Sequence, residues 1–137
     1  MRTILATLVL GFSAVLGFVV KRRQPDAPTQ SLRAIPQQLN RKDFLAPESA
    51  WLVAVFTSST CDACRDVATK AKVLASHDIE VQILEYPGMR ALHERYAIEA
   101  VPTTVIADSH GIVRYGILGP VTATDLWAAM TKLVSRV

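Results

Sequence analysis

The chain has 137 residues, half of them apolar, which is enough for one compact domain with a short appendage. Its formal charge of +3 arises in the first 30 residues, because residues 31–137 carry 11 Lys or Arg against 11 Asp or Glu. A globular part without net positive charge lacks the electrostatic footprint of a nucleic-acid-binding protein, so we expect no nucleic-acid partner.

The first predicted element is an apolar helix over residues 3–20, a run of 18 residues without a charge. At about 1.5 Å per residue this helix is about 27 Å long, close to the hydrocarbon thickness of a bilayer. Lys21-Arg22-Arg23 follows it directly, and no clean cleavage site of a signal peptide precedes a plausible mature start. We therefore predict that residues 1–23 form an uncleaved anchor with a basic flank, which makes the chain a single-pass protein of the cell membrane.

The charges at the two ends of the anchor bear on its orientation. Lys21-Arg22-Arg23 lies after it, and Arg2 is the one charged side chain before it. The positive-inside rule therefore favours a domain on the cytoplasmic side, although so small a difference leaves the extracytoplasmic side open. Residues 24–34 are mostly polar and contain two prolines, so we interpret them as a linker to a domain over residues 35–137.

Within that domain the pattern alternates between strands and helices. Residues 51–57 are a β-rich, almost continuous apolar run, which is typical of a central strand covered on both faces. The helix expected over residues 62–77 has Ser59 as a candidate N-cap. Its buried face is marked by apolar residues at i, i+4 and i+7: Val67, Ala71 and Leu74.

The remaining elements continue this alternation. They are a strand at 79–84, a helix at 89–97, a strand from 103, a turn at 108–111, a strand at 112–118 and a helix after Thr122, where Asp125 completes a capping box. Gly116 marks a bulge or a close approach of another segment. The stretch 31–40 is ambiguous, and a short edge strand before Pro36 stays open.

Cys61 and Cys64, the only cysteines, fall at the junction between the strand at 51–57 and the helix that follows. The free N–H groups at a helix start and the helix macrodipole favour negative charge. A thiolate on Cys61 is therefore stabilised, and the thiolate is the nucleophile of thiol–disulfide exchange. Two intervening residues let Cys64 reach Cys61 Sγ and resolve a mixed disulfide, so the spacing favours a redox pair.

Other readings of the cysteine pair are a zinc site, a structural disulfide or coincidence. A structural zinc site usually takes four ligands, and none of His77, His93 and His110 lies at ligand spacing. A disulfide that closes so short a loop restrains the unfolded chain little. We therefore expect no metal at the pair.

The order of elements, with Cys61-x-x-Cys64 at a strand–helix junction and Val101-Pro102-Thr103 at the head of a later strand, resembles the thioredoxin superfamily. More closely, the chain resembles small bacterial membrane-tethered thioredoxin-like proteins. The resemblance runs from about residue 35 to the C-terminus. It implies an α/β thioredoxin fold, a central mixed β-sheet flanked by helices, here preceded by one N-terminal transmembrane helix.

The resemblance also implies roles for individual residues. Cys61 is expected to be the attacking thiolate and Cys64 the more buried, resolving thiol. Pro102 is expected to follow a cis peptide bond and to lie against the disulfide. The Val101 backbone is expected to pair with an extended substrate segment as an added strand, with Thr60 as a further substrate contact.

The residues between and just after the cysteines are expected to tune the pair. Asp62 opposes a second negative charge on Cys61, and Arg65 acts in the opposite sense. Ala63 is the other intervening residue. A thiolate that is only modestly stabilised makes the domain a reductant or an exchange catalyst rather than a strong oxidant.

The chain departs from the thioredoxin pattern beneath the resolving cysteine. Members of the family usually bury an aspartate there, and the matching position is Val55. The lysine that often partners this aspartate falls near Ile83. Glu85 is the closest acid on that strand, on a side that the sequence does not define, so the proton acceptor for Cys64 is not identified.

These residues together predict a membrane-anchored enzyme, a thiol–disulfide oxidoreductase that reduces or exchanges protein disulfides. It needs no cofactor beyond the Cys61–Cys64 dithiol, acts as a monomer, and has as partners a disulfide-containing protein, an electron donor and, through residues 3–20, the membrane. One alternative is a thioredoxin-fold binding or scaffold module with a vestigial or structural cysteine pair. Another is a thiol metallochaperone for a soft ion such as Cu(I).

Overall fold

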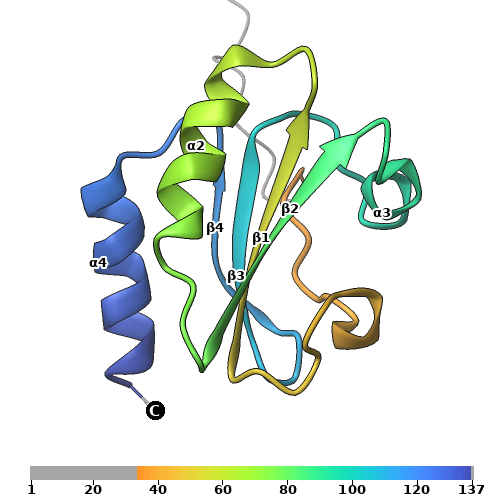
Figure 1. Cartoon of the computed structure of the whole chain (residues 1–137). Coiled ribbons are helices and arrows are strands. Elements are labelled where there is room, and N and C mark those ends of the chain that lie inside the picture. The colour runs from red at the N-terminus through yellow and green to blue at the C-terminus, as the bar shows by residue number, and fades with distance from the viewer. Residues whose placement is uncertain (1–33, 137) are drawn as a thin grey trace, which may run out of the picture. The chain divides into compact units, whose positions relative to one another are not determined.

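The computed structural model describes residues 34–136. Its strands are β1 (Trp51–Ser58), β2 (Ile79–Tyr86), β3 (Thr103–Asp108) and β4 (Val113–Leu118). They form a four-stranded sheet in the order β2-β1-β3-β4 (Figure 1). β1 runs parallel to β2 and antiparallel to β3, and β3 and β4 are antiparallel, so the predicted central mixed sheet is confirmed.

Helices lie on both faces of this sheet. They are α2 (Asp62–Lys72), α3 (Arg90–Arg95) and α4 (Ala123–Val134), with the 3-10 turn η2 (Arg41–Asp43). Figure 1 shows α2 and α4 on one face and α3 with η2 on the other. The helix predicted to reach residue 77 ends at Lys72, because Leu74 N–H already bonds to Ala71 C=O three residues back and the chain turns toward β2.

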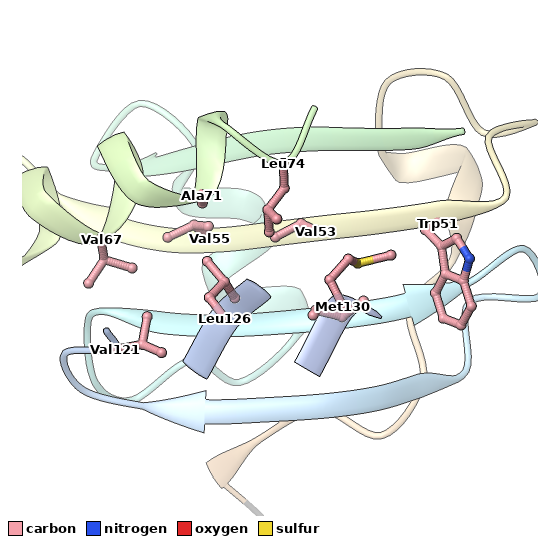
Figure 2. Close-up of a cluster of buried hydrophobic side chains, with 10 residues drawn as sticks. Trp51, Val53, Val55, Val67, Ala71, Leu74, Val121, Leu126 and Met130 are labelled. Carbon is pink, nitrogen blue, oxygen red and sulfur yellow. The ribbon is translucent and has the colours of Figure 1, made fainter. Parts of the chain in front are cut away.

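β1 is the interior strand that the apolar run predicts, with every residue from Trp51 to Thr57 buried. Its alternate side chains serve two separate cores. Trp51, Val53 and Val55 join the cluster under α2 and α4 that Figure 2 shows. Leu52, Ala54 and Phe56 pack in the other cluster, on the side of α3. Burial on both faces explains why the run lacks polar alternation.

The hairpin predicted between β3 and β4 is present, with its turn at Asp108–Gly111. Asp108 Oδ1 accepts hydrogen bonds from the N–H groups of His110 and Ile112, which holds the turn. Gly111 has φ +78°, and a Cβ at this position would collide with the carbonyl oxygen of Leu39. A glycine is therefore required here by both backbone conformation and space.

Gly116 marks a close approach, as the sequence suggested. A Cβ there would lie 2.5 Å from Cγ2 of Ile35. The irregularity in the β3–β4 ladder lies elsewhere, between Ile106 and Ala107. Within residues 34–40 no strand forms, and Gln38 makes a single isolated β-bridge to Ile112.

The anchor predicted over residues 1–23 and all but the last residue of the linker at 24–34 lie outside the described residues. Between residues 34 and 136, the helices are all too short or too polar to cross a bilayer.

The N-cap that the sequence predicts at Thr122 is confirmed, while the Asp125 carboxylate accepts the Thr122 hydroxyl in place of the backbone N–H that a full capping box uses. This cap yields a stability prediction. Thr122 Oγ1 accepts the N–H of Asp125 at 3.1 Å. Thr122→Ala should therefore lower the free energy of unfolding by about 1 kcal/mol, because an N–H of the first turn loses its partner. Urea titration followed by circular dichroism measures this. Thr124→Ala, at an exposed position of the same turn, is the control, and an equal loss there would contradict the assignment of the cap.

Candidate active site

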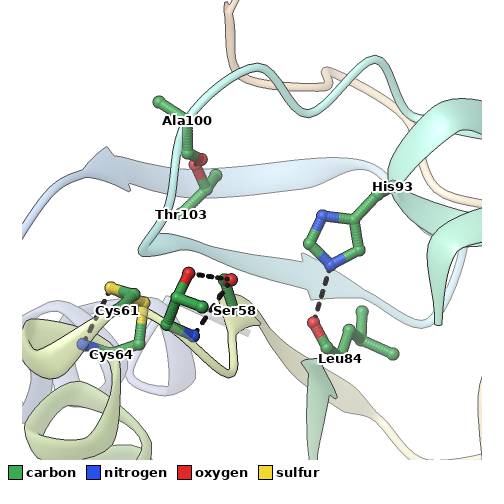
Figure 3. Close-up of a disulfide and its surroundings, with 8 residues drawn as sticks. Ser58, Cys61, Cys64, Leu84, His93, Ala100 and Thr103 are labelled. Carbon is green, nitrogen blue, oxygen red and sulfur yellow. Dashed lines mark hydrogen bonds between the residues drawn. A yellow bond between two sulfur atoms is a disulfide. The ribbon is translucent and has the colours of Figure 1, made fainter. Parts of the chain in front are cut away.

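Cys61 and Cys64 meet where β1 gives way to α2. The strand ends at Ser58, a short turn follows, and α2 begins at Asp62. The two cysteines form a disulfide with their Cα atoms 5.3 Å apart (Figure 3). The pair therefore lies at the carboxyl end of β1, one of the two interior strands of the sheet.

Cys61 is itself the N-cap of α2. Its backbone is extended, with φ −105° and ψ 108°, and its Sγ accepts the N–H of Cys64 at 3.2 Å. The predicted cap at Ser59 is therefore wrong, because the turn after β1 takes up two more residues before the helix starts. The observed N-cap favours thiolate chemistry, because Cys61 Sγ directly receives an N–H from the helix terminus, and this contact favours negative charge on that sulfur.

The two sulfurs differ in access. Cys64 is 2% exposed, whereas Cys61 is partly exposed. Cys61 is therefore the more accessible of the two residues to a group in solution. This asymmetry fits an attacking Cys61 and a more buried, resolving Cys64.

The Val101–Pro102 loop lies beside the end of β1. The peptide bond between these two residues is cis, as the resemblance implied. Phe56 pairs with Thr103 in the antiparallel ladder, so continuing that register sets the loop opposite the last residues of β1. Thr103 Oγ1 donates to the Ala100 carbonyl at 2.7 Å, a bond that fixes the corner drawn in Figure 3.

The backbone of Val101 makes no hydrogen bond to the rest of the described chain. Ser58 and Val101 line the same recess of about 460 Å³, which extends along α3. An extended peptide could pair with the N–H and C=O groups of Val101 as an added strand.

The residues around the pair lie at the surface. Asp62, Ala63 and Arg65 are all exposed in the first turn of α2. Thr60 is exposed too, and its hydroxyl lies 3.2 Å from that of Ser58. Charges at positions 62 and 65 therefore act on the sulfurs partly through water, which weakens each of them.

The structure places the residues beneath the resolving cysteine. Val55 is fully buried in the apolar cluster under α2, and Ile83 packs against that cluster. Glu85 lines a recess of about 230 Å³ together with Cys61 and Cys64, so its side chain is on the cysteine side of the sheet. Thr57 lines the same recess. Thr57 lies two residues after Val55 on the same strand, and residues two apart face the same side of a sheet. This spacing in the sequence could have identified Thr57 as a neighbour of the cysteines.

Among residues 34–136 no group of three or more His, Cys, Asp or Glu side chains could hold a metal ion. His93 is buried, and its Nε2 lies 2.7 Å from the Leu84 carbonyl (Figure 3). Its ring also packs edge-on against Phe56, at 5.2 Å between centroids. These contacts give His93 a structural role.

Known structures share this fold. The thioredoxin of Fasciola hepatica is 23% identical, with a TM-score of 0.53, over 61% of this chain and 81% of its own. Mitochondrial thioredoxin 3 of Saccharomyces cerevisiae is 19% identical, with a TM-score of 0.53, over 63% and 81%. A mutant thioredoxin of Halobacterium salinarum is 22% identical, with a TM-score of 0.52, over 58% and 71%.

No protein-family model matches the chain, and no curated protein matches it in sequence. At identities of 19–23% the structural likeness establishes the fold, so residues 34–136 have a thioredoxin-like fold.

Proposed function

We propose that this thioredoxin-like chain is a membrane-anchored thiol–disulfide oxidoreductase that reduces or exchanges disulfides of other proteins. One observation carries the proposal: a partly exposed Cys61 caps a helix and is bonded to a buried Cys64. The helix terminus stabilises the thiolate that must attack, and the buried partner is held where it can close the cycle. The anchor at residues 3–20 and the cytoplasmic side remain part of the proposal.

The reaction uses the reduced pair. The Cys61 thiolate attacks one sulfur of a substrate disulfide, a mixed disulfide forms, and the other substrate sulfur leaves as a thiolate that takes up a proton. Cys64 then loses its proton and attacks Cys61 Sγ. The Cys61–Cys64 disulfide forms, the second substrate sulfur leaves, and two electrons have passed to the substrate. A separate electron donor restores the dithiol.

The neighbours of the pair would hold the substrate. The free N–H and C=O groups of Val101 support strand pairing with an extended segment around the substrate disulfide. Pro102 follows Val101 in the same loop, and Thr60 stands exposed before Cys61. These three residues are the proposed substrate contacts, and the chain would act as a monomer.

Single-cysteine variants of the full chain test this function. Cys64→Ser should accumulate mixed disulfides with cellular proteins, because Cys61 still attacks but nothing resolves the product. Cys61→Ser should accumulate none, because Cys64 is buried. Non-reducing gels of whole-cell extracts, with the double serine variant as the control, measure both. Mixed disulfides absent from both single variants would instead favour a binding module with an inert cysteine pair.

A further inference from the structure

In the resolving step, the group that accepts the proton of Cys64 has not yet been identified. Cys64 must lose its proton to attack, yet the position where thioredoxins usually bury an acid holds Val55, which is fully enclosed by apolar side chains. Val55 can accept no proton. A group elsewhere on the cysteine side of the sheet must take it, or the step is left to water.

The recess beside the disulfide holds two groups suited to this task. Thr57 is 3% exposed, and its Oγ1 is buried without a hydrogen-bond partner among residues 34–136. Glu85 stands beside it, because Thr57 and Glu85 are register partners in the parallel β1–β2 ladder. Both line the recess of about 230 Å³ that Cys61 and Cys64 also line.

An unpartnered buried hydroxyl is unusual, because leaving such a group unsatisfied costs about 1–3 kcal/mol. Valine would fill nearly the same volume without that cost. We therefore expect the Thr57 hydroxyl to gain a hydrogen-bond partner during the reaction. The transfer of a proton from a thiol to a carboxylate would use this hydroxyl, because a hydroxyl can accept one hydrogen bond and donate another at the same time.

We propose that Glu85 is the proton acceptor for Cys64, reached through the Thr57 hydroxyl and the polar wall of the recess. This inference rests on the proposed function. In the resolving step the S–H bond of Cys64 breaks, and its electron pair stays on the sulfur and forms the bond to Cys61 Sγ. The proton ends on the Glu85 carboxylate, and the bond between Cys61 and the substrate sulfur breaks.

Other charges face the same recess and must be weighed. Arg65 and Lys72 line it from α2, and both would favour a thiolate on either cysteine. Glu85 opposes that charge. If Glu85 acted only through its charge, its removal would therefore ease ionisation of Cys64 and speed resolution. A proton acceptor gives the opposite sign, so the direction of the change separates the two roles.

Rapid mixing of the reduced full chain, held in a mild detergent, with an aromatic disulfide such as Ellman's reagent tests the proposal. Attack by Cys61 releases the first coloured thiolate, and resolution by Cys64 releases the second. In Glu85→Gln we expect the second phase to slow roughly tenfold at pH 6.5, less than the roughly 10²–10⁴-fold typical of general-base catalysis because water can also take the proton, while the first phase changes less than twofold. The deficit should shrink as the pH rises, because hydroxide then removes the Cys64 proton without help from a carboxylate.

Two further variants sharpen the test. Glu85→Asp keeps the carboxylate and should recover part of the rate. Thr57→Val should also slow the second phase without lowering stability, because its hydroxyl makes no hydrogen bond to lose. The matched control is Glu80→Gln on the same strand. Glu80 pairs with Leu52, whose side chain packs on the other face of the sheet.

A second phase in Glu85→Gln that matches Glu80→Gln at every pH, or that is faster, would overturn the proposal while leaving the oxidoreductase intact. A missing first phase in the wild-type protein would be a failure of the proposed function, and this inference would fail with it.

Discussion

Replacing Phe56 with alanine should lower the free energy of unfolding by about 3–5 kcal/mol. Phe56 is fully buried in β1 and is among the largest enclosed side chains of the described residues. Its ring meets His93 at 5.2 Å and Tyr96 at 6.4 Å between centroids. Alanine would leave a cavity between β1 and α3 that these two rings can fill only in part.

Chemical denaturation of the full chain in a mild detergent, read by pulse proteolysis, measures this loss. Val73→Ala is the control, because Val73 is 63% exposed and its truncation should change stability by less than about 0.5 kcal/mol. A loss below about 1 kcal/mol in Phe56→Ala would mean that this side of the core collapses freely. Phe56→Leu, which keeps most of the volume, should fall between the two.

The order of elements was accessible from the sequence because each element carried a local signal. The run at Trp51–Thr57 has no polar residue before its last position, and a strand enclosed on both faces needs that composition. The turn before Gly111 and the N-cap at Thr122 are equally local. The cysteine spacing, followed by Val101-Pro102-Thr103, then indicated the candidate site.

What the sequence left undecided depends on contacts between distant segments. The neighbour that forces a glycine at position 116 is Ile35, some eighty residues earlier, and no local pattern names it. Whether Glu85 faces the cysteines depends on the register between β1 and β2. The N-cap was misplaced by two residues because serine and cysteine both precede the helix, and only the path of the turn selects between them.

The second large effect concerns the redox potential. Asp62 is exposed at the first position of α2, directly after Cys61. Its carboxylate opposes a thiolate on Cys61 and so disfavours the reduced form. Asp62→Asn removes that opposition and should lower the pKa of the Cys61 thiol. Asp62→His adds a positive charge when protonated and should lower that pKa further.

A more stable thiolate stabilises the reduced protein, so both variants should be more oxidising. Near pH 7, where part of the Cys61 thiol is ionised, we expect the potential of Asp62→His to rise by about 40 mV, roughly a 20-fold change in the equilibrium with glutathione, and that of Asp62→Asn by about half as much. The wild-type potential should lie nearer the about −270 mV of thioredoxin than the about −120 mV of a strong oxidant.

The pH dependence separates charge from any local change of structure. Imidazole is cationic below its ordinary pKa of about 6.5 and neutral above it, and a nearby thiolate raises that pKa. The two variants should therefore differ most near pH 7, where a Cys61 thiolate and a cationic imidazole coexist, and converge by about pH 9, where histidine and asparagine are both uncharged. Equilibrium titrations of the full chain against glutathione at both pH values measure this, with Asp66→Asn, one turn further along α2, as the control. A difference in potential between Asp62→His and Asp62→Asn that stays constant at all pH values would show that shape, and not charge, causes it. A wild-type potential above about −150 mV would contradict the assignment as a reductant.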